Sequence, residues 1–188
     1  PSKYQGLPVT SIRDEAFYEC WNLTSINIPM GVTSIGHEAF YNCESLESIE
    51  IPTSVTSIGA GVFYDCSSLE SISVAEGNED YASIDGNLYS KDGKTLIQYA
   101  CGKIATSFAV PSSVTSIGDY AFCDCYSLES IEIPTSVTSI GAYAFSGCGS
   151  LESIEIPSSV TSIGRGAFSD CDSLTSISLP AGVTSIGD

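Results

Sequence analysis

Apolar residues recur along this chain with a period of 23 residues. The period is clearest in a Val-Thr-Ser-Ile motif that begins at Val9, Val32, Val55, Val114, Val137, Val160 and Val183. Five of the six intervals between these valines are 23 residues, and the interval from Val55 to Val114 is 59. A unit of this length cannot bury its own apolar side chains, so neighbouring units must stack and share one core. The pattern therefore predicts a repeat solenoid that forms a single domain over residues 1–188.

Within one unit, the apolar positions predict where the chain is extended and where it turns. In residues 32–54 the pattern Leu46-x-x-Ile49-x-Ile51 predicts a short β-strand with both isoleucines facing the core. A proline follows this strand, where its fixed φ and missing N–H end strand pairing. The segment around Phe40 has room for one or two helical turns. A column of aromatic side chains is predicted inside the coils, made of Phe17, Phe40, Phe63, Phe122, Phe145 and Phe168.

The long interval contains an insertion over residues 78–113 with a different local pattern. Two Asp-Gly pairs, beginning at Asp85 and Asp92, separate short runs in which apolar and polar residues alternate. Asp-Gly favours the positive φ angles of tight hairpin turns, so the insertion is predicted to be a three-stranded β-meander. Its tyrosines include Tyr81, Tyr89 and Tyr99. They either form an exposed contact patch or pack the hairpins against the solenoid, and packing is the favoured interpretation.

Read along one unit, the repeated string is Ile-Gly-x-x-Ala-Phe-x-x-Cys-x-x-Leu-x-x-Ile-x-Ile-Pro. This string resembles the BspA-like leucine-rich repeat family, and the resemblance covers nearly the whole chain, insertion included. It implies a right-handed solenoid from a secreted or surface-anchored bacterial protein, and several members of that family act as adhesins for host proteins. Two positions depart from the pattern, because Arg13 replaces the glycine seen at Gly36 and Val62 replaces the alanine seen at Ala39. Neither departure changes the predicted fold.

The composition is strongly acidic. The chain has 23 Asp and Glu residues against 6 Lys and Arg, a formal net charge of −17 and a pI near 4.1. Such a charge repels phosphate backbones and anionic lipid headgroups, so nucleic acid is not expected as a partner. No run of 18 apolar residues is present, and insertion into a membrane is not expected either.

Six cysteines occupy the same position in successive units, namely Cys20, Cys43, Cys66, Cys125, Cys148 and Cys171. Stacking would place them about 4.8 Å apart, which is the separation of neighbouring strands. Equivalent side chains in stacked units point in parallel, so their sulfur atoms do not converge as a disulfide requires. The six are therefore predicted to be free thiols that pack as small apolar residues. Cys101 and Cys123 lie outside this column, and a bridge between the insertion and the next unit is an alternative for them.

The chain offers no set of residues for catalysis or for a cofactor. A serine nucleophile needs a histidine base, and His37 is the only histidine. Its position in the period corresponds to Asp119 and Ala142 and faces outward, which indicates a surface residue. The glycines recur once per unit, where the backbone turns, and they form no phosphate-binding loop. Cys123-x-Cys125 is too closely spaced for a zinc site, so no enzyme activity, metal or cofactor is predicted.

Strand alternation turns one side chain of each predicted strand outward. These positions carry Asn27, Glu50, Ser73, Glu132, Glu155 and Ser178. A second acidic set recurs beside them, at Glu47, Glu70, Glu129 and Glu152. The favoured interpretation is a solvated face that keeps the array soluble. A negative ladder for a basic protein partner ranks second, and calcium ranks third because a flat ladder does not place six to eight oxygens around one point.

The predicted function is that of a non-enzymatic binding module outside the cell or on its surface, because the extended face of a solenoid suits large partners. The expected partner is a host protein of the extracellular matrix or of serum. The alternative is a structural spacer that holds another segment away from the cell surface, and the near identity of the units favours it. An array that stops within a unit, after Gly187, is also expected to associate end to end through its exposed apolar coil.

Overall fold

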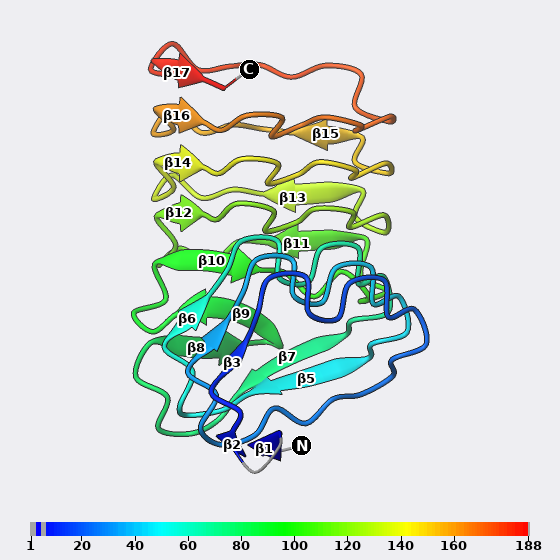
Figure 1. Cartoon of the computed structure of the whole chain (residues 1–188). Helices are drawn as coiled ribbons and strands as arrows, with labels where there is room; N and C mark the ends of the chain where they lie inside the picture. The colour runs from blue at the N-terminus through cyan, green and yellow to red at the C-terminus, as the bar shows by residue number, and fades with distance from the viewer. Residues whose placement is uncertain (1–2, 5–6, 188) are drawn as a thin grey trace.

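The computed structural model describes residues 3–4 and 7–187, so residues 1–2, 5–6 and 188 of the predicted domain lie outside the described part. The backbone winds into a stack of coils that follow the 23-residue period (Figure 1). A complete coil has a first strand, a turn segment, a second strand and a proline corner, and in the coils that begin at residues 9 and 160 the second strand is reduced to a single bridge, at Ser25 and Ser178. The solenoid predicted from the period is confirmed.

The first strand of each coil is the Ser-Ile pair of the Val-Thr-Ser-Ile motif. These two-residue strands stack in parallel with an offset of one period, so that Ser34 pairs with Ser57. One sheet contains β3 (Ser11–Ile12), β4 (Ser34–Ile35) and β6 (Ser57–Ile58). A larger sheet contains β12 (Ser116–Ile117), β14 (Ser139–Ile140), β16 (Ser162–Ile163) and β17 (Ser185–Ile186). The sequence does not predict this column, because two residues are too few to show an alternating pattern.

The second strand of each coil is the one predicted from the Leu-x-x-Ile-x-Ile pattern. Parallel pairs are formed by β5 (Ser48–Ile51) with β7 (Ser71–Val74), and by β11 (Ser107–Ala109) and β15 (Ser153–Ile154) on either side of β13 (Ser130–Glu132). In β5, Ile49 and Ile51 are buried while Ser48 and Glu50 are exposed. The outward and inward positions are therefore those that the alternation predicts.

The turn segment between the two strands is not helical, contrary to the prediction of helical turns around Phe40. No helix occurs in residues 3–4 and 7–187, and so none there could cross a membrane. Two positions per coil have a positive φ, which ends a helical run. The first holds Glu15, Glu38, Gly61, Tyr120, Tyr143 and Gly166, and the second holds Glu19, Asn42, Asp65, Asp124, Gly147 and Asp170. Backbone groups then pair between coils, as when the Phe40 N–H donates to the carbonyl of Val62 (3.0 Å).

The insertion begins with antiparallel strands and then returns to the solenoid. Its strands β8 (Tyr81–Ile84), β9 (Asn87–Ser90) and β10 (Thr95–Gln98) pair antiparallel in chain order. Strand β10 also pairs in parallel with β12, and β11 with β13. Residues 91–113 are therefore an additional coil, and the predicted meander accounts for only the first part of residues 78–113. The sequence pattern does not reveal this coil, because Gly93-Lys-Thr-Leu96 stands in register with Val114-Thr-Ser-Ile117 of the next coil.

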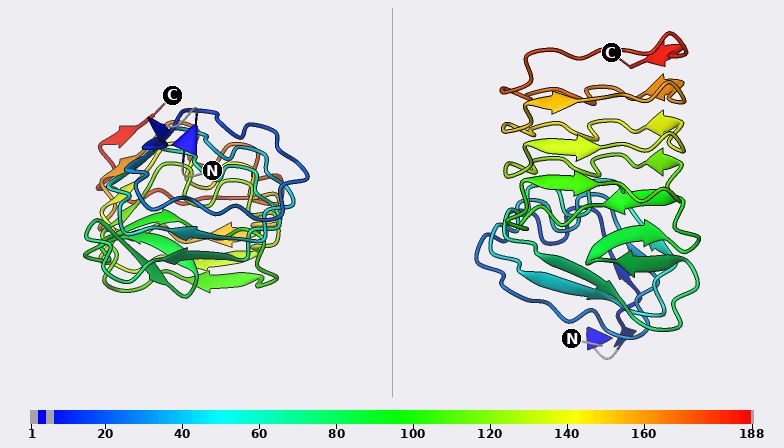
Figure 2. Two further views of the ribbon diagram at one scale, coloured as in Figure 1. Left: turned by 60° about the horizontal axis from the view of Figure 1, so that its bottom comes forward. Right: turned by 180° about the vertical axis from the view of Figure 1, so that it is seen from behind.

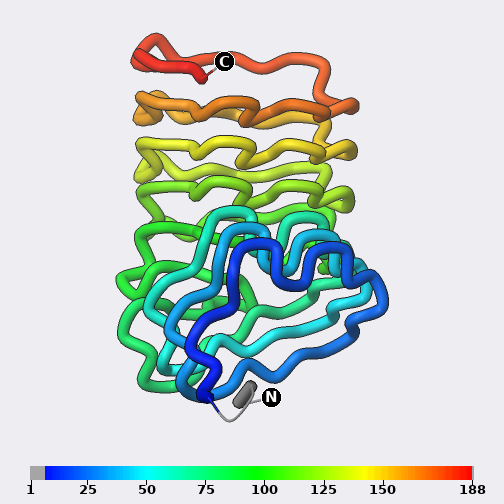
Figure 3. The backbone as a smooth tube through the Cα atoms, viewed as in Figure 1, coloured from blue at the N-terminus to red at the C-terminus, as the bar shows by residue number. Residues whose placement is uncertain are grey.

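The insertion is a wedge that bends the stack. On the strand side, β8 and β9 contact β7, and β10 lies beside β12, so the insertion separates the earlier coils from the later ones. On the side of the turn segments, the rings of Tyr64 and Tyr120 are in direct contact, with centroids 5.6 Å apart. The coils of residues 9–77 are consequently inclined to the later coils, as Figures 2 and 3 show. The turn segments lie on the inner side of this bend.

The core is divided at the same place. Phe17, Phe40 and Phe63 stack in one hydrophobic cluster, with centroids 5.1 and 5.6 Å apart. Tyr99 begins the second cluster, where its ring stacks on Phe122 at 5.3 Å. The predicted aromatic column is thus present in two parts. Ahead of the first coil, β1 (Lys3–Tyr4) and β2 (Leu7–Pro8) form a short antiparallel hairpin.

Candidate binding faces

The six residues predicted to point outward are all exposed, and the insertion separates them into two groups. They are Asn27, Glu50, Ser73, Glu132, Glu155 and Ser178. Glu50 pairs with Ser73 between β5 and β7, and Glu155 is bridged to Ser178. In β11 the residue in register with Glu132 is Ala109, so the insertion interrupts the polar row. We call these six residues the outward strand face.

Two separate grooves run across the outward strand face. Asn27 and Glu50 line the smaller one, with a volume of about 240 Å³. The larger one, of about 820 Å³, is lined by Glu132, Glu155 and Ser178 above buried isoleucines. Carboxylates spaced one strand apart over an apolar floor can hold an extended polar chain. They do not form a nucleophile–base pair.

The second acidic set is also exposed, at Glu47, Glu70, Glu129 and Glu152. Their backbones continue the coil-to-coil ladder, because the Glu70 N–H donates to the Glu47 carbonyl (2.9 Å) and the Glu152 N–H to the Glu129 carbonyl (3.0 Å). Over residues 3–4 and 7–187, no three His, Cys, Asp or Glu side chains converge as a metal site requires.

The tyrosines of the insertion do not form an exposed patch. Tyr89 and Tyr99 are each 1% exposed, and Tyr81 is half-buried. Tyr89 lies on β9, between β8 and β10 in the sheet, with its side chain in the hydrophobic core, and Tyr99 extends the aromatic column. The contact-patch hypothesis is therefore wrong for Tyr89 and Tyr99, and these two side chains pack the core.

Four cysteines of the predicted column are free thiols that donate hydrogen bonds to the preceding coil. The acceptor is the carbonyl of the phenylalanine 26 residues earlier, in the pairs Cys43–Phe17, Cys66–Phe40, Cys148–Phe122 and Cys171–Phe145, at 3.1 to 3.2 Å. Burial raises the pKa of the Cys148 thiol to about 12. Burial also raises the pKa of the Cys171 thiol, so Cys148 and Cys171 are protonated donors and not reactive thiolates.

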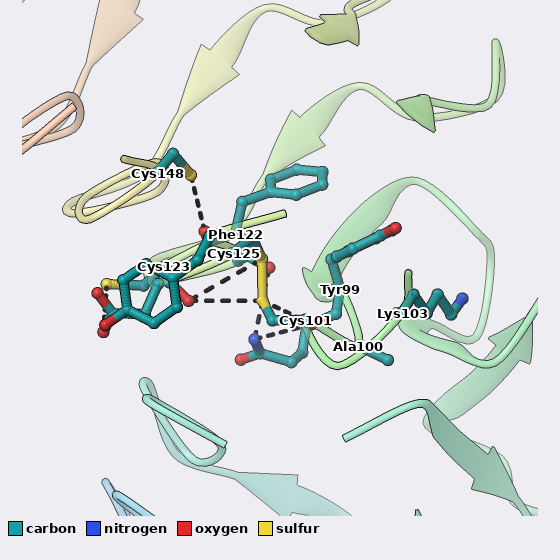
Figure 4. Close-up of a disulfide and its surroundings, with 12 residues drawn as sticks. Tyr99, Ala100, Cys101, Lys103, Phe122, Cys123, Cys125 and Cys148 are labelled. Atoms are coloured by element: carbon teal, nitrogen blue, oxygen red, sulfur yellow. Dashed lines mark hydrogen bonds between the residues drawn. A yellow bond between two sulfur atoms is a disulfide. The ribbon is translucent and has the colours of Figure 1, made fainter. Parts of the chain in front are cut away.

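One cysteine of the column is not free, because Cys125 forms a disulfide with Cys101 (Figure 4). The prediction that all six periodic cysteines are reduced is wrong for Cys125, and the bridge does not involve Cys123, which is buried and free. The reason is the additional coil. Cys101 lies 24 residues before Cys125 and not one period of 23, so the two side chains are not equivalent and need not point in parallel. Their Cα atoms are 4.6 Å apart, within disulfide range.

His37 is exposed, as predicted, and it also has a structural role. Its Nδ1 accepts a hydrogen bond from the backbone N–H of Ala60 in the next coil, at 3.1 Å. Asp14 does the same for the N–H of His37, and Asp119 for the N–H of Ala142. The histidine thus replaces a carboxylate that caps a backbone donor between coils.

A row of tyrosines on the turn segments was not identified from the sequence. We call it the tyrosine ladder, and it consists of Tyr18, Tyr41, Tyr64, Tyr120 and Tyr143. Successive ring centroids are 4.6, 4.8, 5.6 and 5.2 Å apart. The first three follow the core phenylalanine, whereas Tyr120 and Tyr143 stand three positions earlier in their coils. Because the tyrosines occupy two different positions of the repeat, the sequence period does not reveal the ladder. The structure shows it, since Tyr64 contacts Tyr120 across the insertion.

Carboxylates of the second positive-φ position lie beside this ladder. Burial raises the pKa of Asp124 to about 6, and the nearby charges of Asp65 and Asp170 add to the effect. Burial also raises the pKa of Asp65, against a hydrogen bond donated by the Tyr126 hydroxyl at 3.5 Å. The turn side therefore carries negative charge that is incompletely solvated.

Replacing Asp124 with asparagine is expected to raise the melting temperature at pH 7 by a few degrees. Because its pKa is higher in the folded chain than the ordinary 3.8, the native state binds more protons than the unfolded chain between about pH 4 and 6. Stability therefore falls as the pH rises through this window, and the full cost of the ionised carboxylate is present at pH 7. The wild type should therefore gain stability as the pH falls from 7 to 5, and D124N should gain less. Circular dichroism melts at pH 5, 6 and 7 measure this.

The matched control is Asp172→Asn, which removes one exposed carboxylate from the same side of a later coil. It should follow the wild-type pH dependence. Equal slopes for D124N and the wild type would contradict the role given to Asp124.

Comparison with known proteins agrees with this architecture. The profile of a family described as "BspA type Leucine rich repeat region" matches six copies, over residues 10–97 and 93–188. The crystal structure of the pneumococcal vaccine antigen PcpA matches 98% of the chain with 30% identity and a TM-score of 0.81. A leucine-rich cell surface protein of Faecalibacterium prausnitzii matches 96% with 29% identity and a TM-score of 0.62. A leucine-rich repeat protein of Bacteroides ovatus matches 99% with 34% identity and a TM-score of 0.59.

The chain covers 52%, 63% and 45% of these three structures, respectively. It therefore corresponds to about half of their length. No curated protein sequence matches the chain.

Proposed function

Because the chain belongs to the family of BspA-type leucine-rich repeat proteins, we propose that it is a non-enzymatic module that binds a protein partner at the outer surface of a bacterial cell. The observation that carries this proposal is the outward strand face, where Glu132, Glu155 and Ser178 line a groove of about 820 Å³. Residues on rigid stacked strands keep a fixed spacing, which suits recognition of an extended partner surface. The similarity to a leucine-rich cell surface protein of Faecalibacterium prausnitzii supports the location.

The proposal is tested by binding to immobilised host proteins of the extracellular matrix and serum, with affinities measured by surface plasmon resonance. A partner should be found, and Glu132→Gln combined with Glu155→Gln should weaken its binding roughly tenfold, since two charges at the centre of the contact are lost. The control is Glu76→Gln with Glu79→Gln, which removes two exposed charges outside this groove. Equal losses in both variants would mean that net charge, and not the groove, determines binding.

The near identity of the coils favours a second function, that of a structural spacer. A spacer needs length and stiffness and no specific side chains on its surface. If no host protein binds, or if every bound protein is indifferent to the groove variant, the spacer function replaces the binding function.

A further inference from the structure

The insertion contains two buried asparagines whose side-chain amides are used differently. Asn78 is 1% exposed and Asn87 is 0% exposed. The amide nitrogen Nδ2 of Asn78 donates to the carbonyls of Pro52 (2.8 Å) and Val55 (3.0 Å). Among the residues that the structure describes, the Nδ2 of Asn87 has no acceptor within hydrogen-bond distance. A buried amide nitrogen without a partner destabilises the fold, so the environment of Asn87 needs an explanation.

The oxygen of the Asn87 amide is held by two donors, which fixes the orientation of the group. The backbone N–H of Ala100 donates to Oδ1 at 3.0 Å, and the Nζ of Lys103 donates to the same atom at 2.9 Å. Both partners are donors, so the atom between them must be the oxygen. A rotation of the amide would place its nitrogen against both donors, and the nitrogen therefore stays on the unpartnered side.

Lys103 brings a partly buried amine against this amide. It follows the turn that contains Cys101 (Figure 4), and its Nζ lies 5.2 Å from the centroid of the Tyr99 ring. Because a C=O bond is about 1.23 Å long, the Cγ atom of Asn87 is at most about 4.1 Å from Nζ. Burial lowers the pKa of Lys103, against an opposing effect of Asp85. A larger fraction of the amine is therefore neutral and nucleophilic than in an exposed lysine.

A neutral amine beside a carboxamide can form an amide bond between the two side chains. Nζ attacks Cγ of Asn87, and the Ala100 N–H stabilises the negative charge that develops on Oδ1. The Cγ–Nζ bond forms and the Cγ–Nδ2 bond breaks. Over the whole reaction Nζ loses two protons and Nδ2 gains two, so a lysine ammonium and a carboxamide become a secondary amide and an ammonium ion. The reaction needs no oxidant and no cofactor.

Two neighbouring side chains can carry these protons. The charge of Asp85 acts on both Lys103 and Tyr89, and its carboxylate can accept a proton from Nζ directly or through one water. Burial raises the pKa of Tyr89 to about 12, although the Asn87 amide lowers it in part. The phenol therefore keeps its proton at neutral pH and can donate it to the leaving nitrogen. Lys103 also lines a surface pocket of about 330 Å³, through which ammonia can leave.

We propose that Lys103 and Asn87 form an intramolecular isopeptide bond, an amide between two side chains, with release of ammonia. The bond joins the first residue of β9 to the segment that follows β10. Cys101 lies two residues before Lys103 and is bonded to Cys125. The two covalent links therefore connect the hairpin, the additional coil and the second stack in series, at the place where the repeat is least regular. Unlike the disulfide, the isopeptide bond is not opened by a reductant.

The test is the intact mass of the purified wild-type chain, measured by mass spectrometry after unfolding and reduction. The mass should be lower than the sequence mass by about 17 Da, the mass of ammonia. Trypsin does not cut after an acylated lysine, so the digest should contain residues 14–91 joined to residues 95–165 and no peptide that ends at Lys103. Fragmentation of the joined peptides should place the link between Asn87 and Lys103. The readout involves no binding partner, so its outcome is independent of the proposed function.

Matched variants identify the groups that react. Lys103→Arg keeps the positive charge and removes the nucleophilic amine, so this variant should have its full sequence mass. Asp85→Gly removes the carboxylate and leaves Gly-Gly, which suits the same hairpin turn, so this variant should retain an unreacted fraction. The control is Lys91→Arg, because Lys91 is a second lysine of the insertion whose Nζ donates to the backbone carbonyl of Asn78. It should lose ammonia as completely as the wild type does.

The inference is overturned if the wild-type chain has its full sequence mass, also after prolonged incubation at mildly alkaline pH. It is overturned as well if Lys103→Arg shows the same loss of mass, or if trypsin still cuts after Lys103 in the wild type, because the ammonia would then come from another amide. An Asp85→Gly chain that reacts as completely as the wild type would contradict the role given to Asp85.

Discussion

Replacing Gly141 with alanine is expected to lower the free energy of unfolding by about 3 kcal/mol, because it overpacks the contact between two coils. A Cβ at this position would come under 3.0 Å from the backbone nitrogen of Asp119 in the preceding coil. The backbone cannot retreat easily, since the Gly141 N–H donates to the carbonyl of Ile117 at 2.9 Å. The added methyl group must therefore push two coils apart at a point where backbone hydrogen bonds hold them together.

The control for this prediction is Gly149→Ala in the same coil. A Cβ at Gly149 would have no heavy atom within 4 Å, so its effect should stay within about 0.5 kcal/mol. Urea unfolding followed by circular dichroism compares the two variants. If they have the same midpoint, the coils are not in the close contact described.

The same contact explains why the first coil can depart from glycine at this position. Gly36, Gly59 and Gly164 would each clash with the preceding coil if they carried a Cβ. Arg13 occupies this position in the first coil, and in the described part of the chain no coil precedes it. The side chain therefore meets no backbone there, and the substitution noted in the sequence is compatible with the stack.

The sequence predicts the period, the core and the outward strand face because each depends on a local pattern. Leu46, Ile49 and Ile51 alternate with polar residues, so their direction follows from strand geometry alone. The Ser-Ile strands have no such pattern, since their pairing depends on a neighbour 23 residues away. The absence of helical turns depends on positive φ angles at Glu38 and Asn42. Glutamate and asparagine do not indicate a positive φ as clearly as glycine does.

The additional coil and the tyrosine ladder could not be predicted from the sequence, for a common reason. In the insertion Leu96 pairs with Ile117, 21 residues away, whereas Phe108 pairs with Ile131 at the normal 23. The coil thus shifts its register within a single turn, and a search at a fixed period does not detect it. The contact of Tyr64 with Tyr120 exists only because this coil is short on the turn side.

Removing the disulfide is expected to lower the free energy of unfolding by about 3 kcal/mol, since it closes a loop with a sequence separation of 24 residues. The bridge ties the additional coil to the first coil of the second stack. This coil departs from the consensus at the Val-Thr-Ser-Ile motif, so we expect it to depend on the bridge more than a regular coil would. Reduction of the wild type, or Cys101→Ala combined with Cys125→Ala, should move the urea midpoint to lower concentration.

Thiol chemistry and a matched variant decide whether this bridge is the cause. Unfolded, unreduced protein should titrate with six free thiols, those of Cys20, Cys43, Cys66, Cys123, Cys148 and Cys171. The double variant should no longer respond to reductant. Cys123→Ala removes a buried free thiol next to the bridge, so its smaller loss should be equal with and without reductant. Eight free thiols, or a wild-type midpoint that reductant does not change, would show that Cys101 and Cys125 pack without bonding and that stacking alone holds the additional coil.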